Sequence, residues 1–116
     1  LSKTLLSLLA ADRVPIVLNA VRSCGYLIQY CLNEQLDLPS QILVPFVRTM
    51  NHSSNEVKQL LARVSTHLAK NVPIDKMTPE FLKLLLPTLV NGTKEKNSYV
   101  KANSEIALIT VLHLRE

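Results

Sequence analysis

Tryptophan is absent from this 116-residue chain, aromatic residues make up only 4% of it, and glycine occurs only twice. A β-rich fold needs more glycine for its turns and more aromatic residues for its strands. The hydrophobic 47% of the chain is instead dominated by leucine and valine, which suit interlocking helices. We therefore predict an all-α fold.

Motifs for the common kinds of chemistry are also missing. The histidines, His52, His67 and His113, have no His-Glu-x-x-His spacing, and the cysteines form no Cys-x-x-Cys pair. There is no Gly-x-Ser-x-Gly elbow for a nucleophile, and two isolated glycines cannot make a phosphate-binding loop. We predict a non-enzymatic protein with no catalytic residues, no cofactor and no metal.

The positions of the two cysteines indicate the redox state of the compartment in which the protein is found. Cys24 and Cys31 lie seven positions apart on one predicted helix, so about 10 Å separates them along its axis and they cannot bridge each other. Both fall on the apolar stripe, which predicts buried free thiols in a reducing, cytoplasmic environment. No run of 18 apolar residues without charge occurs, so we expect no membrane span and no membrane partner.

What the chain does contain is an internal repeat. A leucine-rich run broken by one proline occurs at residues 42–47 and again at 84–89, and each is followed by a polar turn and a second apolar run. Pro45 and Pro87 are 42 positions apart, and Val57 and Val100 are 43 apart. A period of about 40 to 47 residues with two helical patterns is typical of HEAT and armadillo repeats. The sequence thus predicts an α-solenoid of antiparallel helix pairs, an architecture that binds partners.

Hydrophobic periodicity places the helices and divides the chain into units. We expect helices over 1–11, 16–34, 40–50, 56–70, 79–90 and 98–114. They form one HEAT-repeat segment with a truncated unit (1–36) and two full pairs (37–72 and 73–116), taken as a fragment of a longer solenoid. The last helix is apolar around much of its circumference, as expected if another repeat covered it.

Local signals refine these helix ends. Asp12 and Thr78 are expected to cap the helices that follow them, and Asn97 or the next residue is expected to start the last helix. The helix before it is expected to run to about Val90 and to end at Asn91-Gly92. Gly25 lies in the middle of a helical pattern, where it costs about 1 kcal/mol relative to alanine, so we expect a neighbouring helix to approach closely there.

The candidate partner-binding surface is basic. The net charge is +4, and cations occur on the polar faces of the predicted second helices and in the loop between the last two. Each of these cations taken singly can also be an ordinary solvent-exposed residue of a helix face, and Glu56, Glu95 and Glu105 interrupt the positive field. Binding of nucleic acid through phosphate contacts stays open but is not favoured, because base stacking needs more aromatic residues. The candidate residues are Lys58, Arg63, Lys70, Lys94, Lys96 and Lys101.

The last repeat resembles a known family. The run Leu84-Leu85-Leu86-Pro87, the loop from Asn91 through Gly-Thr-Lys-Glu-Lys to Asn97, and the stretch 100–108 are similar to the C-terminal HEAT repeats of the translational activator of general amino acid control. The resemblance is strongest over 81–116. It implies a cytosolic scaffold that lies along ribosomes and activates the kinase of eukaryotic initiation factor 2-alpha in amino acid starvation. The alternative is a HEAT-repeat adaptor of transport, trafficking or the cytoskeleton that is unrelated to translation.

Overall fold

The computed structural model describes residues 7–37 and 40–114, and within them it contains helices and no strands. The all-α prediction is therefore confirmed for this part of the chain. Residues 7–9 are helical, whereas the rest of the predicted helix 1–11 lies largely outside the described residues. The longer elements are α2 (Val14–Asn33), α3 (Ser40–Arg48), α4 (Asn55–Asn71), α5 (Pro79–Thr93) and α6 (Ser98–Leu114), with 3-10 turns η1 (Thr49–Asn51) and η2 (Ile74–Lys76).

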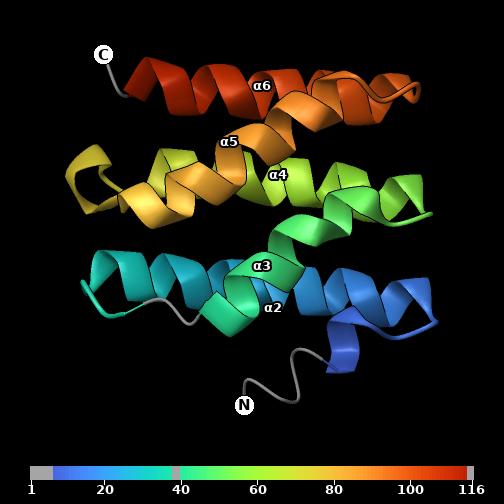
Figure 1. The fold of residues 1–116 in the computed structure, drawn as a ribbon, viewed down its shortest axis with the longest axis horizontal. Coiled ribbons are helices and arrows are strands. Elements are labelled where there is room, and N and C mark those ends of the chain that lie inside the picture. Colours follow the sequence, from blue (N-terminus) through green and yellow to red (C-terminus); the bar gives the residue numbers. More distant parts are fainter. Residues whose placement is uncertain (1–6, 38–39, 115–116) are drawn as a thin grey trace.

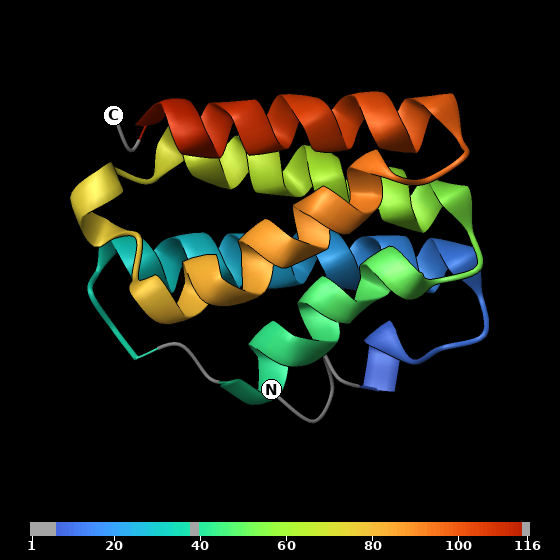
Figure 2. The ribbon, with the colours of Figure 1, turned by 45° about the horizontal axis from the view of Figure 1, so that its top comes forward.

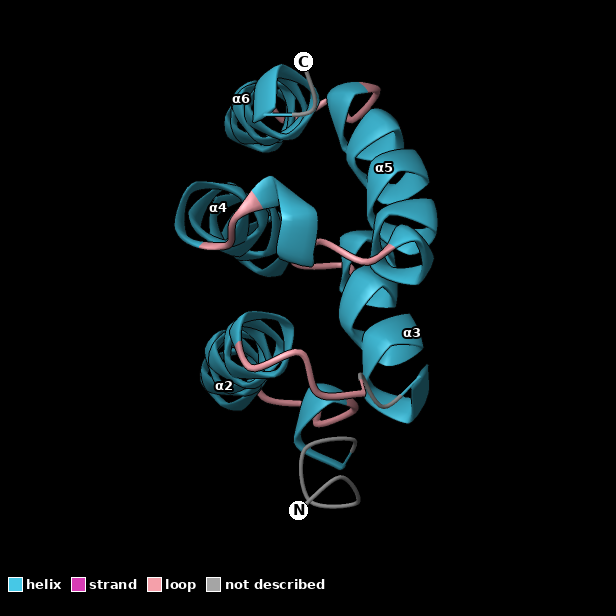
Figure 3. Ribbon diagram, turned by 90° about the vertical axis from the view of Figure 1, so that its left-hand side faces the viewer, coloured by secondary structure: helices cyan, strands magenta, loops and turns pink. Residues whose placement is uncertain are grey.

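The helices form two layers. In one layer α2, α4 and α6 lie side by side and run in the same direction (Figures 1 and 2), with α4 packed between the other two. In the other layer α3 and α5 pack against each other and cross the first layer obliquely (Figure 3). In the chain, α3 leads through η1 into α4, and α5 leads into α6, so each oblique helix is followed by a helix of the parallel layer. The stack agrees with the predicted solenoid, and the predicted boundaries 36/37 and 72/73 lie in connecting segments, although the division into units stays a prediction.

A single apolar core fills the space between the layers. Its largest fully buried side chains include Phe46 and Phe81 from the oblique layer and Ile28, Leu61 and Leu68 from the parallel layer. Within a helix the buried residues recur at spacings of three and four, as Val17, Val21, Cys24 and Ile28 do in α2, which places them on one face. The apolar core is thus built from one face of each helix.

Close helix approach explains both glycines. A Cβ added at Gly25 would lie 2.5 Å from Val64 Cγ1, so α2 and α4 meet there, as the sequence predicted. A Cβ added at Gly92 would lie 2.1 Å from Ser104 Oγ, on α6. The prediction that Gly92 ends its helix was wrong, because α5 continues to Thr93 and uses this glycine for packing. No described glycine has a positive φ.

The helix ends confirm some sequence signals and correct others. Thr78 Oγ1 accepts a hydrogen bond from the Phe81 backbone N–H at 3.4 Å, as predicted for a cap. The predicted Asp12 cap was wrong, because Arg13 occupies the N-cap position of α2 and makes no side-chain cap bond there. The predicted helix 40–50 is α-helical only to Arg48 and then tightens into η1, where Thr49 Oγ1 donates to the Phe46 carbonyl.

The end of α2 is closed by two contacts that sequence reasoning did not foresee. Gln35 takes the left-handed conformation, with φ of 56°, and the Leu36 N–H donates to the Cys31 carbonyl at 2.8 Å. This is a Schellman motif, in which the left-handed position is usually occupied by glycine. Lys76 Nζ donates to the Asn33 carbonyl at 3.0 Å, which places a cation at the negative end of the helix dipole.

No helix among the described residues is both long and apolar enough to cross a membrane.

Candidate interaction surfaces

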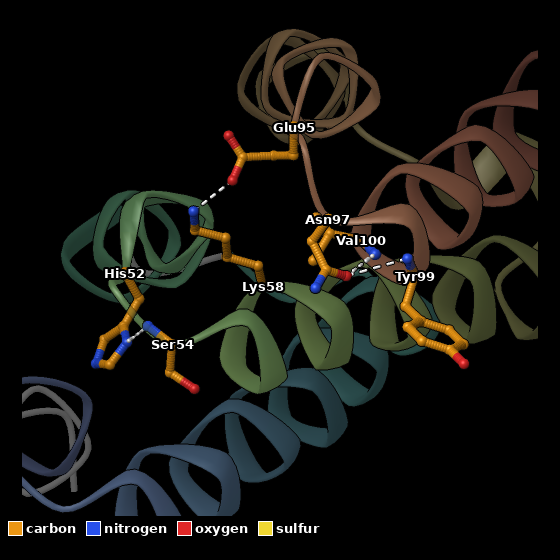
Figure 4. Close-up of polar contacts among 7 residues, drawn as sticks. All are labelled: His52, Ser54, Lys58, Glu95, Asn97, Tyr99 and Val100. Atoms are coloured by element: carbon orange, nitrogen blue, oxygen red, sulfur yellow. Dashed lines mark hydrogen bonds and ion pairs between the residues drawn. The ribbon is translucent and has the colours of Figure 1, made fainter.

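The loop between α5 and α6 is held in a defined shape. Asn97 Oδ1 accepts hydrogen bonds from the backbone N–H groups of Tyr99, at 3.0 Å, and Val100, at 3.1 Å (Figure 4). The predicted start of the last helix at Asn97 or Ser98 is confirmed by this cap and by the helix bounds. Because the cap fixes the end of the loop, Lys94 and Lys96 are presented to solvent at defined positions.

One candidate cation is already paired. Lys58, in the first turns of α4, forms an ion pair with Glu95 of the same loop (Figure 4). The Lys58 side chain is only 16% exposed, and that of Glu95 is 31% exposed. The pair therefore ties the start of α4 to the α5–α6 loop, and Glu95 neutralises the charge that Lys58 was expected to offer to a partner.

A surface hollow of about 560 Å³ lies at this end of the molecule, and we call it the basic hollow. Lys101 is exposed in the first turn of α6, where its backbone N–H donates to the Asn97 carbonyl at 3.0 Å, so it lies close to the hollow without lining it. Lys94, Lys96 and Lys101 are the cations of this region that pair with no carboxylate of the described residues. The hollow is lined by Asn55, Lys58, Lys94, Glu95, Lys96 and Asn97.

The other two candidates lie elsewhere on α4. Arg63 and Lys70 are both exposed and seven positions apart, which is about two helical turns, so they share one face. Lys58 is rotated from Arg63 by about 140° around the same helix. The structure thus does not align the six candidates in one ladder: it gathers four of them around the loop and leaves two on the outer face of α4.

A second concave site was not foreseen from the sequence. It is a groove of about 200 Å³ between α2 and α4, which we call the α2–α4 groove. Positions 22, 25 and 26 on one helix and 60, 63, 64 and 67 on the other have spacings of three and four, a signal that could have indicated two facing stripes. The groove is lined by Arg22, Gly25, Tyr26, Leu60, Arg63, Val64 and His67.

The two thiols are free and buried, as predicted. Burial raises the pKa of the Cys24 thiol to about 11 and also raises the pKa of Cys31. A thiol in this state is a poor nucleophile and a poor metal ligand at neutral pH. Within residues 7–37 and 40–114, no three His, Cys, Asp or Glu side chains gather in a way that could hold a metal ion.

An apolar strip remains uncovered on α6. Ile106, Ile109 and Leu112 are 53%, 66% and 47% exposed, although the opposite face of the helix, with Val100 and Ala107, is buried. Large exposed apolar side chains at helical spacing are typical of a contact surface. Their exposure agrees with the apolar circumference that the sequence indicated.

Comparison with known proteins gives the family. A family model described as "Stalled ribosome sensor GCN1-like, HEAT repeats" matches residues 1–116, the whole chain. The chain belongs to this family. It is similar to the stalled ribosome sensor GCN1 of Homo sapiens, with 30% identity over 113 residues, and to that of Mus musculus, with 28% identity over 112 residues. No solved structure gives a significant match.

Membership in the GCN1-like HEAT repeats confirms both the solenoid class and the resemblance noted in the last repeat. The matches cover 97% and 96% of this chain but only 4% of each relative, so the chain spans a small part of the length of the curated relatives. Since the family match covers residues 1–116, the relationship extends beyond the stretch 81–116 where the resemblance was strongest.

Proposed function

We propose that the chain is a non-enzymatic scaffold segment that contributes to ribosome association in the cytoplasm. The observation that carries this proposal is the match of the whole chain to GCN1-like HEAT repeats, a family whose name describes a sensor of stalled ribosomes. A stack of helix pairs suits this role, because it presents an extended surface to a large partner. The family match favours this reading over an adaptor of transport, trafficking or the cytoskeleton.

We further propose that the parent protein activates the kinase of eukaryotic initiation factor 2-alpha during amino acid starvation. In this account the segment acts upstream of the kinase, by keeping the parent on the ribosome.

The basic hollow is the surface proposed to contact the ribosome. Lys94, Lys96 and Lys101 are exposed and lie on one capped loop and the helix turn after it, so their charges are held together. A ribosomal surface offers phosphate and carboxylate groups, to which such a cluster is attracted at long range. Lys58 has a different role, since its pair with Glu95 positions the loop.

The proposal is tested by competition in amino-acid-starved cells. The chain is overexpressed, and phosphorylation of initiation factor 2-alpha is measured against cells with an empty vector. We expect the wild-type chain to occupy the ribosomal site of the endogenous sensor and to lower phosphorylation. The triple variant K94E/K96E/K101E should lose this effect at equal expression.

The matched control is a triple reversal of exposed cations that line neither the basic hollow nor any other proposed binding site. Lys70, Lys83 and Arg48 are exposed on α4, α5 and α3, so R48E/K70E/K83E changes the net charge equally. Retained inhibition by this variant, together with loss in the hollow variant, supports the proposed surface. Phosphorylation that is unchanged by the wild-type chain contradicts the proposed function.

A further inference from the structure

We propose that the α2–α4 groove binds an acidic linear peptide that carries one aliphatic or aromatic side chain. The proposal goes beyond ribosome association and does not depend on it, because the groove shares no lining residue with the basic hollow. It rests on the combination of an apolar floor, an exposed aromatic wall and two guanidinium groups in one concave site.

The floor of the groove is apolar because Gly25 has no side chain and the Val64 side chain packs against its backbone. Gly25 of α2 lies directly against Val64 of α4, since a Cβ added at Gly25 would lie 2.5 Å from Val64 Cγ1. Leu60 and Val64 are only half-buried, so they complete the floor while keeping part of their surface open to solvent. The resulting volume of about 200 Å³ is smaller than the ~300–1,000 Å³ of small-molecule pockets. It suits a single side chain of a larger ligand.

One wall of the α2–α4 groove is aromatic. Tyr26 is 68% exposed and contacts His67 in a T-shaped arrangement, with ring centroids 6.4 Å apart. The side-chain amide of Asn71 donates to the His67 carbonyl at 2.8 Å and lies 3.2 Å from Nδ1. These contacts place Asn71 beside the ring of His67, which in turn packs against Tyr26.

The alignment of α2 with α4 places Arg22 and Arg63 at the same height along the two helices. α2 and α4 run parallel (Figure 2), and the contact of Tyr26 with His67 fixes their alignment. Arg22 precedes Tyr26 by one helical turn, and Arg63 precedes His67 by one turn. The two guanidinium groups therefore belong to the same end of the groove.

Neither guanidinium is neutralised. Arg22 Nη1 donates to the uncharged Asn19 side chain at 3.3 Å, and neither arginine forms an ion pair with a carboxylate of the described residues. No acidic residue lines the groove. Paired guanidinium groups recognise carboxylates through bidentate hydrogen bonds, so charge complementarity assigns an acidic ligand.

A peptide fits these features better than a nucleic acid does. Single-stranded nucleic acids need open aromatic faces on which bases stack. Here Tyr26 is the one tyrosine that lines the groove, and the floor consists of aliphatic side chains, which match an apolar side chain. An extended or helical segment with an apolar anchor between carboxylates is a common mode of peptide recognition.

The test is fluorescence polarisation with three labelled peptides on the 116-residue chain. The first peptide has one phenylalanine flanked on each side by two aspartates, in the second the aspartates are asparagines, and in the third the phenylalanine is glycine. We expect saturable binding of the first peptide and at least tenfold weaker binding of each of the other two. This comparison needs no protein variant, so it does not depend on whether a variant folds.

The site is located with R22A/R63A against the matched control K70A/K83A, which removes the same charge outside the groove. Circular dichroism verifies that both retain their helix content. We expect R22A/R63A to weaken binding at least tenfold and K70A/K83A to leave it within twofold. The proposal is overturned if the acidic peptide does not bind at millimolar concentration, if both double variants weaken binding equally, or if a labelled oligouridylate binds in place of the peptide.

Discussion

Replacing Gly25 by alanine tests the close contact between α2 and α4. In an ordinary helix this change is favourable by about 1 kcal/mol, because alanine has the better helix propensity. Here the new Cβ would lie 2.5 Å from Val64 Cγ1, so α2 and α4 have to separate or Val64 has to move. Overpacking of this kind costs about 1–3 kcal/mol. Since the steric cost exceeds the propensity gain, we expect Gly25→Ala to destabilise the chain by about 1 kcal/mol.

The partner residue supplies the control. Val64→Ala alone removes half-buried methyl groups and should cost about 1 kcal/mol. In the double variant the collision is gone and the propensity gain remains, so the two substitutions should couple favourably by about 1–2 kcal/mol. Urea unfolding followed by circular dichroism gives all four free energies. Stabilisation by Gly25→Ala alone, or strict additivity in the cycle, would refute the close approach.

Three further substitutions probe single features of the chain. Gln35→Gly should stabilise it by about 1 kcal/mol in urea unfolding, because the left-handed φ of 56° strains any residue with a Cβ; an unchanged or lower stability argues against this conformation. Ser104→Ala should stabilise by roughly 1 kcal/mol in the same assay, because the buried Ser104 Oγ has no hydrogen-bond partner among the described residues; a loss above that size points to a bonded hydroxyl. Burial raises the pKa of Cys24 from 9.0 to about 11, so the thiol of the unfolded chain ionises first. Its contribution to the free energy of unfolding is therefore constant below pH 9 and falls as the pH rises towards 11. With Cys24→Ala, the free energy of unfolding should fall less steeply from pH 9 to 11 than it does in the wild type. Identical slopes for the variant and the wild type would contradict the burial of this thiol.

Features that depend on local sequence were predicted well. The helices α4 and α6 begin and end within a residue or so of their expected positions, because apolar periodicity and, for α6, the Asn97 cap act over a few residues. The expected close approach at Gly25 was also confirmed, since a glycine inside a helix needs a packing reason. The class of fold follows from these local patterns and their repetition.

Features that depend on contacts between distant residues were not predicted. Gly92 reads locally as a helix stop, but its packing against Ser104 overrides that signal and α5 continues. The Lys58–Glu95 pair joins residues 37 positions apart, which no helical periodicity relates. For the same reason the α2–α4 groove was not predicted, because the register that brings Arg22 level with Arg63 exists only once the helices stack.

The most direct test of ribosome association through the basic hollow is a binding isotherm with purified components. Fluorescently labelled chain is titrated with purified stalled ribosomes, alongside K94E/K96E/K101E and the control R48E/K70E/K83E. We predict saturable binding by the wild type, at least tenfold weaker binding by the hollow variant, and near wild-type affinity for the control. Absence of saturable binding, or equal weakening in both triple variants, would contradict the account.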